Sequence, residues 1–148
     1  MNELQELYRE VILDHNRNPR NFGTLEDADE VIDAVNPLCG DKLKLYVSLN
    51  NGNIDDIRFQ GTGCAISVAS ASLMTERVKG ATVDAALELQ TQIHALLKGE
   101  AAADDPSLGK LAALAGVREF PSRVKCASLS WHALKSGLSG GDGQVSTE

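Results

Sequence analysis

The stretch "KLKLYVSLNNGNIDDIRFQG", residues 42–61, determines the class of fold, because it contains two strand patterns joined by a turn signal. Apolar residues at positions 43, 45, 47 and 49 alternate with other residues, as in a strand with one buried face. The letters NNGN that follow indicate a hairpin, since Asn and Gly tolerate the positive φ angles of tight turns. A looser alternation at residues 28–35 precedes the hairpin. The sequence therefore predicts a small three-stranded antiparallel sheet.

Helical patterns flank these strands on both sides. Residues 3–14 carry apolar side chains three and four positions apart, which predicts an amphipathic N-terminal helix. After residue 64 the period changes, and helices are predicted over residues 65–80, 82–99, 108–116 and from about residue 121 onward. A run of strands followed by helices predicts an α+β fold, with the helices packed on one face of the sheet and preceded by the N-terminal helix.

Length and composition predict one domain. The chain has 148 residues, of which 43% are hydrophobic, and we expect the domain to span residues 1–138, with a flexible tail at 139–148. The net charge of −7 argues against binding to nucleic acid or to an anionic membrane surface. No apolar run approaches the roughly 20 residues of a membrane span, and no basic start precedes an apolar core. We expect a cytoplasmic protein that is monomeric when free.

The three cysteines all lie at predicted ends of elements. Cys39 lies in a turn between strands, Cys64 follows "GTG" at a strand-to-helix junction, and Cys126 lies near the start of the last long helix. An odd count cannot form a complete disulfide framework, and reduced thiols suit a reducing compartment. Metal binding, thiol chemistry and inert burial remain as explanations.

A metal site gives this pattern a reason. Zinc and iron both accept thiolates, and three cysteines together with Asp41 would make a tetrahedral set. The carboxylate would be the least thiophilic ligand and the natural one to exchange. The alternative is that each cysteine is a small buried apolar residue and that Asp41 serves only the turn. The spacing does not choose between them, because it matches no zinc-finger pattern.

Four motifs together resemble a known family. "LYREVILDHNRNPRNFG" at 7–23, "NPLCGD" at 36–41, "GTGCAISVASASLM" at 61–74 and "RVKCASLSWHAL" at 123–134 resemble the U-type iron-sulfur cluster assembly proteins, SufU and IscU, whose domain is that of the NifU N-terminus. The chain is closer to the SufU branch, because it carries an insert around residues 99–118. Lys125 also stands where IscU-type proteins carry a histidine ligand, and "FPSRVK" replaces their "LPPVK" segment.

The resemblance implies a zinc-dependent sulfurtransferase. Cys39, Asp41, Cys64 and Cys126 would bind Zn²⁺, and Cys39 would accept persulfide sulfur from a cysteine desulfurase of the SufS type. In that family a histidine of the desulfurase replaces one zinc ligand and frees the acceptor thiolate. The activity would belong to the pair of proteins rather than to a stand-alone enzyme.

The resemblance equally allows a scaffold. In that role Cys39, Cys64 and Cys126 would hold a transient [2Fe-2S] cluster, with Asp41 beside them, and pass it to apo-proteins or to downstream assembly proteins.

Two other classes of function stay open from the residues themselves. One is a metal-free enzyme with Cys64 as nucleophile and His15 or His132 as base. The other is an interaction module with a purely structural zinc. Replacing Asp41 separates them, since a thiol enzyme should hardly respond to its loss.

Several neighbouring residues have weaker assignments. Arg123 could pair with Asp41 or stabilise a thiolate, and His15 could cap the end of the first helix. Arg17, Arg20 and Asn21 are candidates for contacting a partner.

Overall fold

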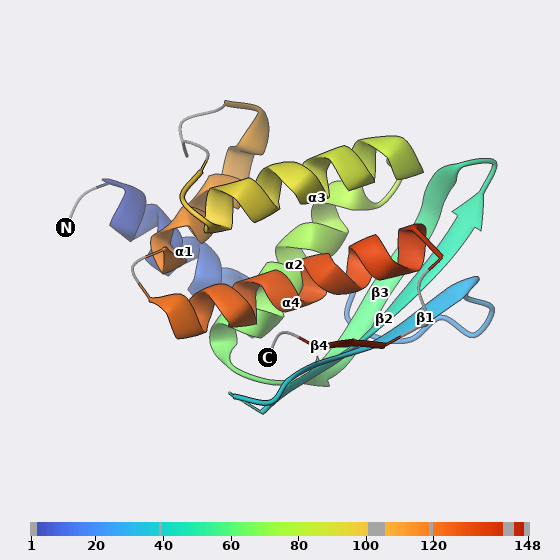
Figure 1. The fold of residues 1–148 in the computed structure, drawn as a ribbon, viewed down its shortest axis with the longest axis horizontal. Coiled ribbons are helices and arrows are strands. Elements are labelled where there is room, and N and C mark those ends of the chain that lie inside the picture. The colour runs from blue at the N-terminus through green and yellow to red at the C-terminus, as the bar shows by residue number, and fades with distance from the viewer. Residues whose placement is uncertain (1–2, 39, 101–105, 119, 141–143, 147–148) are drawn as a thin grey trace.

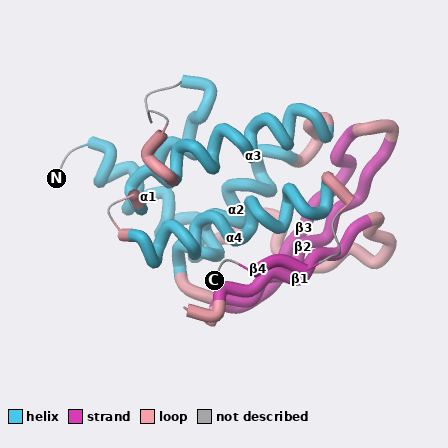
Figure 2. Tube along the Cα trace, in the orientation of Figure 1, coloured by secondary structure: helices cyan, strands magenta, loops and turns pink. Residues whose placement is uncertain are grey.

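The computed structural model describes residues 3–38, 40–100, 106–118, 120–140 and 144–146. In chain order the elements are α1 (Glu3–Arg17), β1 (Glu30–Asn36), β2 (Asp41–Asn50), β3 (Asn53–Thr62), α2 (Ala65–Val78), α3 (Val83–Leu97), the 3₁₀ segment η1 (Pro106–Val117), α4 (Pro121–Leu138) and β4 (Gln144–Ser146). The sheet forms one layer and the helices lie together against one of its faces (Figures 1 and 2). The predicted α+β class is therefore confirmed.

The sheet contains four strands in the order β3-β2-β1-β4. The predicted antiparallel pairs are present, and the β2–β3 hairpin turns at Asn51 and Gly52, both with positive φ. The prediction of a three-stranded, purely antiparallel sheet is wrong, because β4 adds a parallel strand beside β1. This strand comes from the predicted tail and has three residues, too few for an alternating pattern to be recognised.

Alternation along the strands places one face of the sheet in the core. Leu43, Leu45 and Val47 of β2 are buried, as predicted, and Ile57 and Phe59 of β3 lie on the same side. Helix α4 covers β1 and β2, while α2 contacts β3. The helices therefore cover one face, as the sequence indicated.

Helix α2 lies at the centre of the helical layer, and its small side chains permit that position. It contacts α1 on one side and α4 on another, and most of its residues are buried. Ser70 donates a hydrogen bond of 2.6 Å to the Ala127 carbonyl and accepts one of 3.1 Å from Trp131 Nε1. Trp131 is therefore a core residue.

The 99–118 insert contributes to the core. Its η1 segment contacts α1 and α3, and it buries apolar residues that include Leu108, Leu111 and Leu114. The segment is a 3₁₀ helix interrupted at Gly109, whose φ of 54° and ψ of −129° are not helical. Arg77 of α2 donates hydrogen bonds to the carbonyls of Ser107 and Leu108, which fixes the start of η1 on the rest of the fold.

The segment after α1 protects the outer edge of β3. Phe59 donates a hydrogen bond to the Asn21 carbonyl and accepts one from the Gly23 amide, at 3.0 and 2.8 Å. The Phe22 ring packs edge-on against Phe59, with 5.3 Å between the ring centroids. This pairing occupies polar groups that an open strand edge would otherwise expose.

Among the helices of the described residues, none has the length and apolar character needed to cross a membrane.

Candidate metal centre

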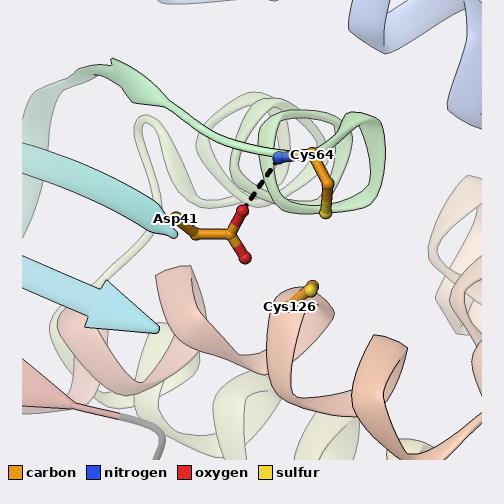
Figure 3. A group of neighbouring side chains, drawn as sticks. All are labelled: Asp41, Cys64 and Cys126. Carbon is orange, nitrogen blue, oxygen red and sulfur yellow. Dashed lines mark hydrogen bonds between the residues drawn. The ribbon is translucent and has the colours of Figure 1, made fainter. Parts of the chain in front are cut away.

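Three of the four predicted ligands converge where β2, α2 and α4 begin. One ligand atom from each of Asp41, Cys64 and Cys126 lies within 4.8 Å of the other two. Figure 3 shows the Asp41 carboxylate and the two sulfur atoms turned toward a common space. The fourth predicted ligand, Cys39, lies outside the described residues, and its role remains a prediction.

Asp41 is held by hydrogen bonds at both carboxylate oxygens. It is the first residue of β2, where the sequence suggested a turn, and only 1% of its surface is exposed. Its Oδ1 accepts a hydrogen bond of 2.8 Å from the Cys64 amide, and its Oδ2 accepts one of 3.2 Å from Asn36 Nδ2. The carboxylate therefore lies at the N-terminal end of α2, where the helix dipole favours a negative charge.

Two glycines of the "GTGC" motif make room for this arrangement. A Cβ atom on Gly63 would lie 2.6 Å from Asp41 Oδ1, inside any permitted contact. A Cβ atom on Gly61 would lie 2.1 Å from the Lys42 carbonyl oxygen, and the φ of Gly61 is +150°. Both positions therefore require glycine, one for the carboxylate and one for the strand pairing.

The two described thiols differ in exposure. Cys126 is buried, whereas Cys64, the residue before α2, is half-buried and more accessible. Cys126 Sγ accepts a hydrogen bond of 3.5 Å from Asn36 Nδ2. The site therefore has a closed side at Cys126 and a more open side at Cys64.

The sequence prediction missed Asn36, although a signal was present. The burial pattern of β1 turns Ile32, Ala34 and Asn36 toward the core, and the same period of two can be read from the sequence. An asparagine in register with two apolar residues marks a buried polar group, and buried polar groups need partners.

Arg123, near the start of α4, contacts two aromatic side chains, and one of them, Tyr8, interacts electrostatically with Cys64. The Arg123 guanidinium carbon is 4.3 Å from the centroid of the Phe120 ring. Burial raises the pKa of Tyr8, while the charge of Arg123 and its hydrogen bond to Tyr8 oppose that rise. Arg123 is thus bound to Phe120 and Tyr8, and no ion pair joins it to Asp41 in the described part of the chain.

The histidines lie away from the two thiols. His15 is fully buried, and its Nδ1 lies 2.7 Å from the Ser72 hydroxyl, two turns along α2 from Cys64. Because His15 Nδ1 contacts Ser72 of α2 and burial lowers the pKa of the ring, the structure favours a neutral buried ring over the charged helix cap that the sequence suggested. His132 instead packs against His94, with ring centroids 5.6 Å apart. Neither ring is placed to serve as the base of a Cys64 enzyme.

The donor set fits a thiophilic divalent ion. A carboxylate and two thiolates within 4.8 Å would repel one another, and the described hydrogen bonds to them come from uncharged N–H groups. A divalent cation would compensate this charge, and sulfur donors favour zinc or iron over magnesium or calcium. Asp41, Cys64 and Cys126 could therefore hold such an ion.

The fold and the site together define a class: an α+β protein with a thiolate-rich metal centre built where a strand and two helices begin. Comparison with known proteins gives the family. The model of the NifU-like N terminal domain matches residues 7–127, and the chain belongs to this family.

Relatives with similar sequences cover nearly the whole chain. A Bacillus subtilis protein named zinc-dependent sulfurtransferase SufU is 44% identical over 95% of both chains. A Streptococcus pyogenes protein named iron-sulfur cluster assembly scaffold protein IscU is 39% identical, over 93% of this chain and 86% of its own. A Fervidobacterium islandicum crystal structure, described as a possible iron-sulfur cluster assembly scaffold for the SUF system, has a TM-score of 0.84 and 34% identity. That match covers 90% of this chain and 98% of the other.

Proposed function

We propose that this chain is an iron-sulfur cluster assembly protein that acts as a zinc-dependent sulfurtransferase. The observation that carries the proposal is the convergence of Asp41, Cys64 and Cys126 in one largely buried site. The 44% identity to a relative named for this activity supports the same function. Cys39, two positions before Asp41, completes the proposed ligand set.

The protein's own residues have separate tasks in this proposal. Cys39, Asp41, Cys64 and Cys126 bind Zn²⁺, which keeps coordinating thiols deprotonated at neutral pH when it is bound. Cys126 is buried and serves as a fixed ligand. Asp41 is the least thiophilic of the four and the weakest ligand of the set.

Sulfur transfer then needs one exchange of sulfur–sulfur bonds. The Cys39 thiolate attacks the outer sulfur of a persulfide carried by a cysteine desulfurase. A bond forms between Cys39 and that sulfur, the original sulfur–sulfur bond breaks, and the desulfurase cysteine leaves as a thiolate. One sulfur–sulfur bond replaces another, so no oxidant or reductant is consumed, and the outer sulfur keeps its proton. A desulfurase of the SufS type is the proposed donor.

A second candidate is the cluster scaffold. The relative named as an IscU scaffold, 39% identical, supports it, because the same residues could hold a cluster. Lys125 stands where IscU-type proteins carry a histidine, which favours the sulfurtransferase.

In either role we propose that downstream assembly proteins or apo-proteins receive the product. We also propose that the protein works in the cytoplasm and that it is a monomer when free.

Analysis of anaerobically purified protein separates the candidates. After dialysis against a chelator, we expect close to one retained zinc per chain, without iron or acid-labile sulfide. Incubation with a SufS-type desulfurase and cysteine should then add one sulfur atom to Cys39, seen by mass spectrometry of the intact chain and its peptides. Retained iron with matching sulfide would instead favour the scaffold.

The Cys39→Ser variant provides the control for the acceptor. It should take up no sulfur while it remains folded. Sulfur uptake on Cys64 without any bound metal would support the thiol-enzyme alternative and refute the zinc-dependent proposal.

A further inference from the structure

Asn36 lies between two of the proposed ligands and is not itself one of them. It is the last residue of β1, pairs with Asp41 across the β1–β2 ladder, and has no exposed surface. Its Nδ2 lies 3.2 Å from Asp41 Oδ2 and 3.5 Å from Cys126 Sγ. A single amide group thus contacts a carboxylate and a thiol that come from different parts of the fold.

The chemistry of these neighbours fixes the orientation of the amide. An ionised carboxylate and a thiolate only accept hydrogen bonds, and the amide NH₂ group has two N–H donors to offer them. The amide oxygen of Asn36 could offer neither of them a proton. The NH₂ group therefore faces the site, and each of the two acceptors can receive a hydrogen bond from a different N–H.

The other end of the same amide is costly. Asn36 Oδ1 is buried and has no hydrogen-bond partner in the part of the chain that the structure describes. Leaving a buried acceptor unpaired destabilises the folded state, because the group has lost its hydrogen bonds to water without replacement. Folding alone would favour an apolar residue here, in register with Ile32 and Ala34, so the asparagine is best explained by what its NH₂ group does.

We propose that Asn36 is a positioning residue of the metal centre. Its amide holds the Asp41 carboxylate and the Cys126 sulfur beside each other, and its two N–H dipoles offset the negative charge that collects there. The inference rests on the proposed function, because it concerns the same ligands. Groups that orient metal ligands through hydrogen bonds, without binding the metal themselves, typically contribute a factor of about 10–100 in metal affinity.

Cobalt binding tests the proposal without an activity assay. The full chain carrying Asn36→Ala would be titrated with Co²⁺ in competition with a chromophoric chelator, and its absorption spectrum recorded. We expect cobalt to bind about 10–100-fold more weakly than to the unmodified protein. The thiolate-to-cobalt and ligand-field bands should also change, because Asp41 and Cys126 lose their common support.

Asn21→Gly provides the matched control. Asn21 Nδ2 also makes a 3.2 Å hydrogen bond, to Thr75 Oγ1, and its φ of 57° suits glycine. This variant should keep the cobalt affinity and spectrum of the unmodified protein. Unchanged affinity and spectrum in Asn36→Ala, or an equal loss in Asn21→Gly, would overturn the inference.

A measurement on the unmodified protein covers the case in which Asn36→Ala does not fold. In a ¹⁵N-labelled sample, the side-chain amide signals of Asn36 should shift on addition of Cd²⁺, and one proton should couple to ¹¹³Cd through the hydrogen bond to Cys126. If cadmium binds at the site and the Asn36 amide signals do not change, the inference about Asn36 is overturned, whereas the proposed function is not. An unmodified chain that binds neither cobalt nor cadmium would overturn the proposed function as well.

Discussion

The main-chain N–H of Cys64 donates a 2.8 Å hydrogen bond to Oδ1 of Asp41, so the start of α2 is attached to the first residue of β2. The carboxylate thus has a structural role beside its proposed role as ligand. Because the first role needs only an oxygen acceptor and the second benefits from a negative charge, two substitutions can separate them.

Asp41→Asn should keep the acceptor and lose the charge, whereas Asp41→Ala should lose both. We expect both variants to bind zinc at least about tenfold more weakly, on the scale known for altered metal sites. Only Asp41→Ala should also leave the Cys64 N–H unpaired, at a cost of about 1–3 kcal/mol in the free energy of unfolding. Chelator competition and urea unfolding of the metal-free chains measure the two effects. Asp33→Ala, on the exposed side of β1, is the control and should change neither.

Gly63→Ala should damage the site through a single methyl group. Its Cβ would lie 2.6 Å from Asp41 Oδ1, and overpacking of this kind costs about 1–3 kcal/mol. In an Asp41→Ala background the same substitution should cost much less, because the obstructing oxygen is absent. A double-mutant cycle in urea unfolding measures this coupling. Equal costs in both backgrounds would show that backbone strain, and not the carboxylate, excludes a side chain.

The insert should prove essential to stability. Leu111 of η1 is 2% exposed, and truncating a buried leucine costs about 2–5 kcal/mol. We therefore expect Leu111→Ala to lower the free energy of unfolding by an amount in that range. Leu38→Ala, at a position 67% exposed, should change it by less than about 0.5 kcal/mol. Similar small effects in both variants would show that the insert is a surface appendage.

Mild acid should destabilise the metal-free protein. Burial lowers the pKa of both His15 and His132 below the ordinary value of 6.5. The unfolded chain therefore takes up protons first, so stability is complete above about pH 6.5 and decreases as the pH falls below it. The charged groups that act on His15 partly oppose one another, with Arg20 and Lys110 lowering its pKa and Glu76 and Asp14 raising it.

Unfolding in urea between pH 7.5 and 5 measures this slope. His15→Gln should make the dependence shallower, His132→Gln should do the same, and the double variant should come closest to a flat profile. A stability that rises on acidification in the unmodified protein would contradict the predicted direction for both histidines.

The local patterns of the sequence predicted the elements well where period and turn chemistry agreed. The hairpin around Asn51 and Gly52 is confirmed. The helix predicted from residue 82 is confirmed as well, and the Thr82 hydroxyl caps it by accepting a 3.0 Å hydrogen bond from the Ala85 amide. Strand β4 was missed because its partner is β1, and a pairing so distant in sequence leaves no local signal. The core position of the insert was not predicted either, since its apolar residues alone do not say which helices they contact.

The sequence indicated only part of the site, because some of its residues depend on contacts that exist only in the assembled fold. Chemistry made Asp41, Cys64 and Cys126 candidates, because thiols and a carboxylate at the ends of elements can converge on a metal ion, and the family resemblance favoured that role over inert burial. The neutral residues around them had no such signal. Asn36 matters through two hydrogen bonds that depend on the assembled fold, and His15 is buried by the packing of α1 on α2, which its place at a helix end did not reveal.

The three described candidate ligands lie in β2, directly before α2 and in α4, and Asn36 contacts Cys126 across 90 positions of sequence. Closing so long a loop lowers the entropy of the chain, and only the contacts of the completed core offset this loss. During synthesis the first half of the chain leaves the ribosome before Cys126 exists, so an early intermediate has no complete site to offer an ion. Metal loading therefore belongs to the finished molecule, and tight zinc binding would report that the C-terminal helix has docked.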